Sequence, residues 1–339
     1  MPSWEELMTE VQPHIDDNGV VVPGIGVDEL RSKYMTALSE KTGRNVIAYY
    51  SGWLLPGRED NVEVNDRDMT GFMIATRELD CSRGLDLILH TPGGFPNAAE
   101  GIVNYLHSMF GGDIRVIVPH MAMSAGTMIS CSAKTILMGK HSCLGPVDPQ
   151  FGGTPAYNIV KEFTAAQKEM QENPETARYW AIQLGKYPIA FLYTALDAIE
   201  LSDELVGKWL RQHMFAGETG AEVTNKIRRI LRKLNSNNKS HGRHYNYDYC
   251  KELGLKVEAL EDEPVGESVR TPEDEDEELF AELVDTYADM QYKCVEAVLE
   301  TGAKFDFAHY WEDICFKNGP LVSPEIFAEY VAPCYKKTT

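Results

Sequence analysis

The sequence lacks any long apolar run. No window of the 339 residues approaches the roughly 20 consecutive apolar residues that a membrane-spanning helix requires. The first residues, MPSWEELMTEVQPHIDDNG, carry acidic side chains where a secretory signal would have a basic segment followed by an apolar one. These two absences lead us to expect a cytoplasmic protein that does not contact a membrane.

The sequence also lacks paired cysteines and a nucleotide-binding motif. Its seven cysteines are scattered along the chain without a CxxC pair, so neither a zinc site nor a disulfide framework is predicted. No phosphate-binding P-loop occurs, so ATP-driven unfolding of a substrate would require a separate partner. We therefore expect no metal ion and no cofactor.

Positive charge is scarce. The chain carries 32 Lys and Arg against 52 Asp and Glu, which gives a formal net charge of -20. A phosphate backbone would be repelled by such a surface, so the composition argues against a nucleic-acid partner. The basic segment NKIRRILRKL (225–234) has apolar residues at helical spacing and predicts a helix that packs its apolar face.

Strand and helix patterns alternate in the first half of the chain. The strands are continuous apolar runs, which predicts parallel βαβ crossovers with helices on both faces of an α/β sheet. After the turn-rich segment 141–153, the chain is almost wholly helical to residue 234, and a last strand is expected at 254–260. The expected strands are 45–54, 84–94, 114–122 and 134–139, and the expected helices are 65–79, 97–110 and 124–133.

A serine stands where one predicted strand becomes a helix. The hydroxyl of Ser124 would lie at the carboxyl end of the sheet, where open α/β sheets bind ligands. The preceding strand ends in Gly93-Gly94, whose bare backbone can present N–H groups to a ligand. Together with the N–H of Ala125, these amides would form an oxyanion hole beside a nucleophile. Alternatively, Ser124 only caps the helix.

Three segments resemble a known superfamily. LILHTPGG (87–94), VPHMAMSAGTMISCSAKTILMGKHSCLGPVDPQ (118–150) and SHGRHYNYDYCKELGLKVEALED (240–262) are similar to the Clp protease/crotonase superfamily. They are most similar to its serine dehydrogenase proteinase branch, which is related to signal peptide peptidase A and the NfeD-linked serine proteases. The resemblance covers roughly residues 40–262.

The resemblance implies a fold and a reaction. The fold would be a ββα superhelix in residues 41–262, after an N-terminal helical arm (1–40) and before an acidic linker and helical C-terminal extension (263–339). Ser124 would be the nucleophile, with the amides of Gly93 or Gly94 and Ala125 as oxyanion donors. A polypeptide would be the substrate, and the chain would form a homo-oligomer.

The general base is the open question in the sequence. Clp-type proteases place a histidine on the strand after next, but here that region reads CLGPVDPQ. Signal peptide peptidase-like relatives use a lysine, and Lys161 is the best positional match to the lysine of NfeD-linked proteases. A lysine must be buried to act as a base. The apolar stripe formed by Ile159, Phe163, Ala166 and Met170 leaves Lys161 on the other face, so that face would have to line an intersubunit cavity.

Histidines offer a second candidate base. His241 and His244 lie in a polar loop, SHGRHYNYD, where they either act as bases or only form local hydrogen bonds. Asp148 could orient a base or cap a turn, and its place between two turn-forming prolines favours the turn. His90 and His120 lie at the ends of predicted strands near the site, where they either carry protons or are only satisfied core groups.

The sequence therefore predicts a serine peptidase that forms an acyl-enzyme on Ser124. Two alternatives stay open. A crotonase-type acyl-CoA enzyme would share the oxyanion hole but use acidic residues, and the Ser-Ala-Gly at the helix start favours the protease. A catalytically inactive oligomeric scaffold would keep the fold without a working base, which the absent Clp-type histidine allows.

Overall fold

The computed structural model describes residues 26–51, 62–235 and 240–262, together with four two-residue strands outside these ranges. The chain divides into two units, residues 10–269 with Met1, and residues 270–339 with residues 2–9. In the second unit only the antiparallel strands β12 (Cys315–Phe316) and β13 (Gly319–Pro320) are described. The predicted helical extension (263–339) otherwise lies outside the described residues, and so does most of the first half of the predicted N-terminal arm. The strands β1 (His14–Ile15) and β2 (Val21–Val22) pair antiparallel in that arm.

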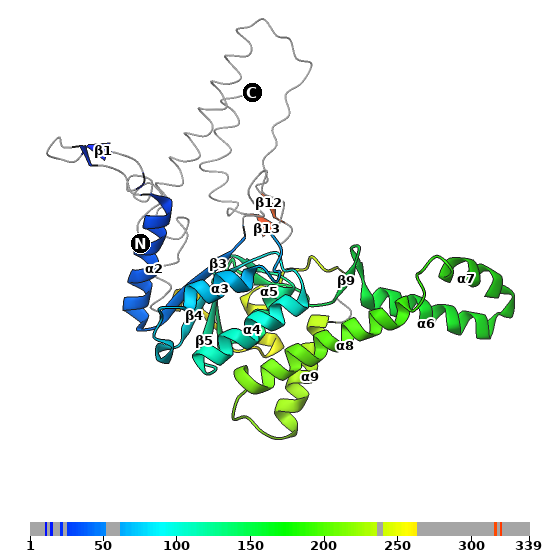
Figure 1. Ribbon diagram of the computed structural model, residues 1–339. Coiled ribbons are helices and arrows are strands. Elements are labelled where there is room, and N and C mark those ends of the chain that lie inside the picture. The colour runs from blue at the N-terminus through cyan, green and yellow to red at the C-terminus, as the bar shows by residue number, and fades with distance from the viewer. Residues whose placement is uncertain are drawn as a thin grey trace, which may run out of the picture. The chain divides into compact units, whose positions relative to one another are not determined.

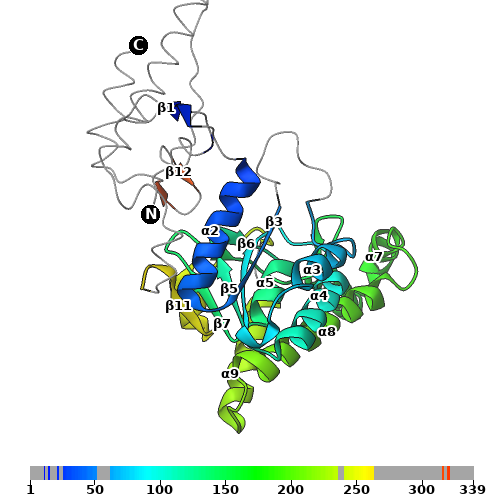
Figure 2. The ribbon, with the colours of Figure 1, turned by 60° about the vertical axis from the view of Figure 1, so that its left-hand side comes forward.

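A five-stranded parallel sheet forms the centre of the first unit. The strand order follows the chain, so each strand lies beside its predecessor. Figure 2 labels β11, β7, β5 and β3 of this sheet, with β11 and β3 towards its two edges. This arrangement confirms the predicted α/β class with parallel crossovers. The strands are β3 (Asn45–Tyr50), β4 (Leu85–His90), β5 (Ile114–Val118), β7 (Thr135–Met138) and β11 (Val257–Ala259).

Helices cover both faces of this sheet, as predicted. On one face, Leu38 of α2 packs with Ile117 and Leu137 of the strands. On the other face lie α3, α4, α5, α8 and α9, whose apolar side chains form the main core. The helices are α2 (Val27–Thr42), α3 (Asp68–Thr76), α4 (Pro96–Phe110), α5 (Ala125–Cys131), α6 (Ala156–Glu172), α7 (Ala177–Leu184), α8 (Phe191–Trp209), α9 (Ala221–Asn235) and α10 (Tyr247–Leu253).

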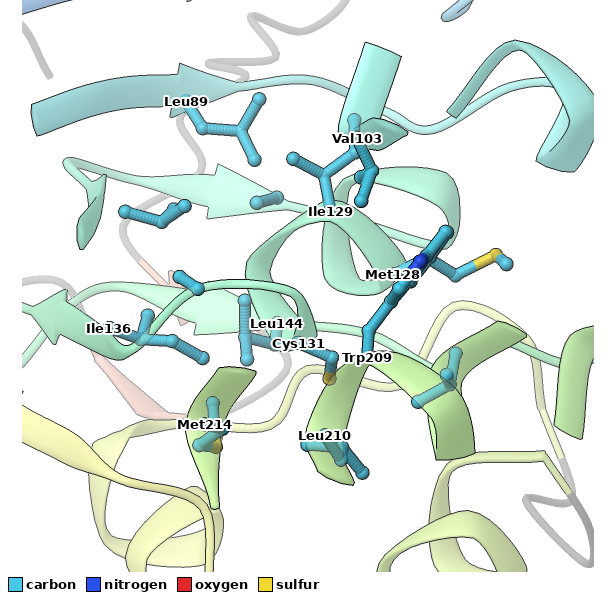
Figure 3. Close-up of a cluster of buried hydrophobic side chains, with 14 of the residues drawn as sticks. Leu89, Val103, Met128, Ile129, Cys131, Ile136, Leu144, Trp209, Leu210 and Met214 are labelled. Atoms are coloured by element: carbon cyan, nitrogen blue, oxygen red, sulfur yellow. The ribbon is translucent and has the colours of Figure 1, made fainter. Parts of the chain in front are cut away.

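The helix α5 occupies the middle of the core. All seven of its residues are buried. Figure 3 shows Met128 and Ile129 of this helix among side chains of the surrounding elements, including Leu89 of β4, Val103 of α4 and Trp209 of α8. Because such packing leaves little room for movement, the backbone at the start of α5 is held in one position.

A second, smaller sheet branches from the first. The prediction of one strand over 114–122 is wrong, because β5 ends at Val118 and Pro119 has no N–H with which to continue the ladder. After this break, β6 (Met121–Ala122) pairs in parallel with β8 (Cys143–Leu144). Thr91 bridges to β6 on one side, and Tyr245 bridges antiparallel to β8 on the other. This small sheet carries the residues of the candidate site.

Helices α6 (Ala156–Glu172) and α7 (Ala177–Leu184) form what we call the arm, which is separate from the predicted N-terminal arm. Helices α6 and α7 extend away from the central sheet in Figure 1, and α6 packs along α8. The chain enters α6 through the hairpin of β9 (Gln150–Phe151) and β10 (Thr154–Pro155). Ile159 and Ala166 are buried on the inner side of α6, which agrees with the apolar stripe expected from the sequence.

A pair of stacked histidines lies outside the small sheet and makes the stability of the fold depend on pH. His107 of α4 stacks on His213 of the π-helical turn η3 (Leu210–Met214), with ring centroids 3.5 Å apart. Burial, and then the nearby His213, lower the pKa of His107 to about 4 from its ordinary value of 6.5. The neutral ring is therefore favoured in the folded state.

We expect acid to destabilise the fold through this pair. The unfolded chain takes up a proton at His107 below about pH 6.5, whereas the folded chain resists protonation down to pH about 4. The stability that the neutral His107 ring contributes is therefore fully present above pH 6.5 and is lost as the pH drops towards 4. Urea unfolding of the wild type and His107→Gln across this range measures the effect. The variant should lose less stability per pH unit, and equal slopes would contradict the prediction.

Candidate active site

Ser124 has a strained backbone at the junction of β6 and α5. Its φ of 48° and ψ of −112° are rare for any residue other than glycine. Such a conformation costs about 1–3 kcal/mol and persists only where the surrounding structure fixes it. Here the buried helix α5 follows immediately and supplies that restraint. Strain of this kind is concentrated at functional sites.

The hydroxyl of Ser124 is not used to hold the fold. The side chain makes no capping hydrogen bond to α5, so the alternative reading of Ser124 as a helix cap is wrong. No hydrogen bond joins it to any residue that the structure describes, and the residue is half-buried while Met123 and Ala125 beside it are buried. The hydroxyl is thus not engaged by the described part of the fold.

Two backbone amides, one in the glycine turn and one at the start of α5, are also unused. Within the described ranges, neither the N–H of Gly94 nor that of Ala125 has a hydrogen-bond acceptor. The N–H of Gly93, in contrast, donates to Thr91 Oγ1 at 3.2 Å. Gly93 lies directly against the serine, since a Cβ on it would stand 2.7 Å from Ser124 Cβ. Of the two glycines, only Gly94 therefore has a backbone N–H without an acceptor among the described residues.

Val64 fixes the position of the Gly94 amide. The N–H of Val64 donates to the carbonyl of Gly93 at 2.8 Å, and the N–H of Phe95 donates to the carbonyl of Val64 at 2.9 Å. A Cβ on Gly94 would come within 2.3 Å of both the nitrogen and the oxygen of Val64. No side chain larger than hydrogen fits there without a backbone shift.

We expect Gly94→Ala to damage both stability and reactivity. The backbone must move to relieve the contact with Val64, which costs about 1–3 kcal/mol and displaces the N–H of Gly94. Thermal unfolding and the rate of reaction with a fluorophosphonate measure the two effects. Gly71→Ala is the matched control, because its Cβ would meet nothing within 4 Å in α3. It should stabilise by about 0.5–1 kcal/mol, and wild-type behaviour of Gly94→Ala would contradict the account.

The small sheet brings three further segments to the same end. Residues 123–124 follow β6 and residues 145–148 follow β8, which is parallel to it. Residues 241–244 precede Tyr245, which is antiparallel to β8, so they leave the sheet at that end as well. With Gly93 and Gly94 after Thr91, they form what we call the site edge.

A histidine and an aspartate are joined at the site edge. His241 Nδ1 lies 3.0 Å from Asp148 Oδ1. The Asp148 side chain is 5% exposed and that of His241 is 32% exposed. A carboxylate oxygen accepts hydrogen bonds, so the Nδ1–H of His241 is the donor in this contact, and in a neutral ring Nε2 then carries the lone pair. In serine hydrolases of the Ser-His-Asp type, a carboxylate holds the histidine base in this tautomer.

Asp148 corrects one expectation from the sequence. We expected its carboxylate to cap a turn, but Oδ1 binds His241 and Oδ2 accepts from Gln150 Nε2 at 2.8 Å. The hydrogen bond from the Gln150 side chain to Asp148 was not predicted from the sequence. The only signal in the chain was the acidic residue in GPVDPQ at the place where Clp-type relatives carry a histidine.

Lys161, the lysine considered as a base, is exposed, unlike the Asp148–His241 pair. It lies on the exposed side of α6, and its amine has no hydrogen bond or ion pair with the residues that the structure describes. No interaction among those residues connects it to Ser124 or to the site edge. The burial that a lysine base needs is therefore not provided within one chain.

The other histidines near the site form a separate group. The rings of His90 and His120 stack with centroids 5.5 Å apart. Burial lowers the pKa of both, and that of His120 is lowered further by His90, His141 and His244. Both rings therefore favour the neutral form. His244 is half-buried beside Tyr245.

The described part of the chain contains neither a metal-binding cluster nor a membrane-spanning helix. Within it, no three His, Cys, Asp or Glu side chains gather in a way that could hold a metal ion. No helix in the same ranges combines the length and the apolar character needed to span a membrane.

The fold and the family comparison agree. The fold is a parallel sheet covered by helices, and a strained serine follows the strand β6 of the second, small sheet. Residues 62–270 match the family described as ClpP-like SDH-type serine proteinase, and the chain belongs to that family. The resemblance to the serine dehydrogenase proteinase branch is thereby confirmed.

Two archaeal proteins are similar in sequence. Uncharacterized protein MJ0137 of Methanocaldococcus jannaschii is 34% identical over 168 residues, which cover 46% of this chain and 57% of that protein. Uncharacterized protein MJ1495 of the same organism is 32% identical over 173 residues, which cover 51% of each chain. The chain thus spans about half the length of the curated relatives it matches.

Proposed function

We propose that this chain is a serine peptidase that hydrolyses polypeptides through an acyl-enzyme on Ser124. The observation that carries the proposal is the state of this residue: a strained backbone, an uncapped hydroxyl and unused amides at Gly94 and Ala125. These are the parts that acyl transfer needs, a nucleophile and donors for the oxyanion. Membership of the serine proteinase family supports the same reaction.

In the proposed mechanism, His241 activates Ser124. Ser124 Oγ attacks the scissile carbonyl carbon while His241 Nε2 takes the hydroxyl proton. Asp148 keeps the ring in the required tautomer and stabilises the imidazolium that forms. The N–H groups of Gly94 and Ala125 donate to the oxyanion of the tetrahedral intermediate. The imidazolium then protonates the leaving amine, and water activated in the same way releases the acyl group.

Lys161 is the alternative base in this proposal. It would have to be buried by a second copy of the chain, since it is exposed in one copy. The pairing of Asp148 with His241 favours the histidine, because a base oriented by a third group is the usual arrangement in serine hydrolases.

We also propose a homo-oligomer. The resemblance to the family implies one, and the arm and α8 expose large apolar side chains, among them Tyr179, Ile182 and Tyr193 at 58%, 60% and 68% exposure. Contact with a second copy of the chain would remove these side chains from water. The molecular mass in sedimentation equilibrium tests this, and the mass of a single copy would contradict it.

A peptidase assay tests the proposed function. Wild type and Ser124→Ala are incubated with an unfolded, fluorescently labelled polypeptide, and new amino termini are counted. We expect hydrolysis by the wild type and a rate lower by at least about 10³-fold in the variant. Equal rates in both proteins would assign the hydrolysis to a contaminant. Thermal stabilisation by acyl-CoA without hydrolysis would instead favour the crotonase-type alternative.

A further inference from the structure

Thr127 is a buried residue of α5 that the proposed mechanism does not use. Its side chain is 0% exposed. The hydroxyl donates to the carbonyl of Ala122 at 2.8 Å and accepts from the N–H of Gly145 at 2.8 Å. Ser130, in the same helix, makes the ordinary bond to the carbonyl four residues back, that of Gly126. Thr127 instead reaches outside its helix in both directions.

The two partners of Thr127 belong to the two segments that carry the reaction. Ala122 is the last residue of β6 and stands two positions before Ser124. Gly145 follows the last residue of β8 and stands three positions before Asp148. The ladder between β6 and β8 ends at Ala122 and Leu144. One oxygen atom therefore continues the connection between the strands beyond their last backbone pair.

We propose that Thr127 is a positioning residue, whose hydroxyl sets the place of the Asp148–His241 pair relative to Ser124. The proposal rests on the proposed function of Ser124. The hydroxyl of Thr127 is bonded to Ala122 and Gly145 and to neither the nucleophile nor the base, so it acts through those two residues. Without the hydroxyl, a buried carbonyl and a buried N–H lose their partner, and the segments must separate to reach others. A displacement of about 1 Å between reacting groups is enough to slow a reaction about 10²-fold.

The test compares Thr127→Val, Thr127→Ser and Thr76→Val in the full chain. Thr76 is the matched control, since it is 1% exposed and its hydroxyl bonds to the carbonyl of Phe72 at 2.9 Å and to Tyr105 Oη at 2.7 Å. For peptide hydrolysis, we expect Thr127→Val to lower kcat about 10²-fold with KM little changed. Thr127→Ser, which keeps the hydroxyl, should retain most of the wild-type kcat, and Thr76→Val should retain all of it.

A spectroscopic readout makes the test independent of hydrolysis. The Nδ1 proton of His241, bonded to Asp148, should give a downfield proton resonance that is absent from His241→Gln. Thr127→Val should shift or lose this resonance, whereas Thr76→Val should keep it. The proposal is overturned if Thr127→Val keeps both kcat and the resonance, or if Thr76→Val changes them equally. If the wild type does not hydrolyse peptides, the proposed function fails and the resonance alone decides the role of Thr127.

Discussion

Replacing Ser124 by glycine is expected to raise the free energy of unfolding by about 1 kcal/mol while abolishing peptide hydrolysis. Glycine adopts the φ of 48° and ψ of −112° without the steric cost that a Cβ imposes. Relief of about 1–3 kcal/mol of strain is partly offset by about 0.4–1 kcal/mol, because glycine gives the unfolded chain more freedom. Urea unfolding and the peptidase assay measure the two effects.

Two further variants separate strain from chemistry. Ser124→Ala keeps the Cβ and therefore the strain, so it should be inactive with stability close to that of the wild type. Ala190→Gly is the matched control, because Ala190 also has a positive φ, 65°, at the start of α8. It should gain stability by about 1 kcal/mol and keep full activity. If Ser124→Gly is less stable than the wild type, the strained serine is not held against its own preference.

Changing either member of the Asp148–His241 pair is expected to cause the largest loss of turnover after Ser124 itself. His241→Gln removes the proposed base. Asp148→Asn keeps the shape of the side chain but allows the amide to donate to Nδ1, which favours the wrong tautomer of His241. In serine hydrolases with this arrangement such a change lowers kcat by about 10⁴-fold. Steady-state kinetics of purified variants give the numbers.

Lys161→Met is the comparison that decides between the two bases. Lys161 is exposed on α6, and methionine keeps the length of the stem while removing the amine. We expect kcat to stay within about 3-fold of the wild type, the range of a surface substitution that leaves the site intact. Loss of turnover in Lys161→Met, together with normal turnover in His241→Gln, would move the role of base from the histidine to the lysine.

The sequence predicted the fold well because its signals were local. Apolar β-branched runs such as residues 114–118 define strands by composition alone. The apolar stripes between them define helices, and the alternation of strands and helices predicts parallel crossovers. The break at Pro119 was missed, although proline cannot pair within a ladder, because the apolar pattern continues through Met121 and Ala122.

The candidate site was only half predictable. Ser124 and the Gly93-Gly94 turn are neighbours of strand ends, so their position at the edge of the sheet follows from the local pattern. The pairing of Asp148 with His241 joins residues 93 positions apart and depends on the antiparallel bridge of Leu144 to Tyr245. No local pattern encodes such a bridge. The choice between Gly93 and Gly94 likewise depended on Thr91, whose hydroxyl occupies one of the two amides.

The reaction of the purified chain with a fluorophosphonate tests the central claim most directly. An activated serine displaces fluoride and forms a stable phosphonyl ester, and peptide mass spectrometry locates the adduct. We predict one adduct per chain, on Ser124, and none in Ser124→Ala. An adduct on another serine, or an unmodified Ser124 in a preparation that hydrolyses peptides, would contradict the account.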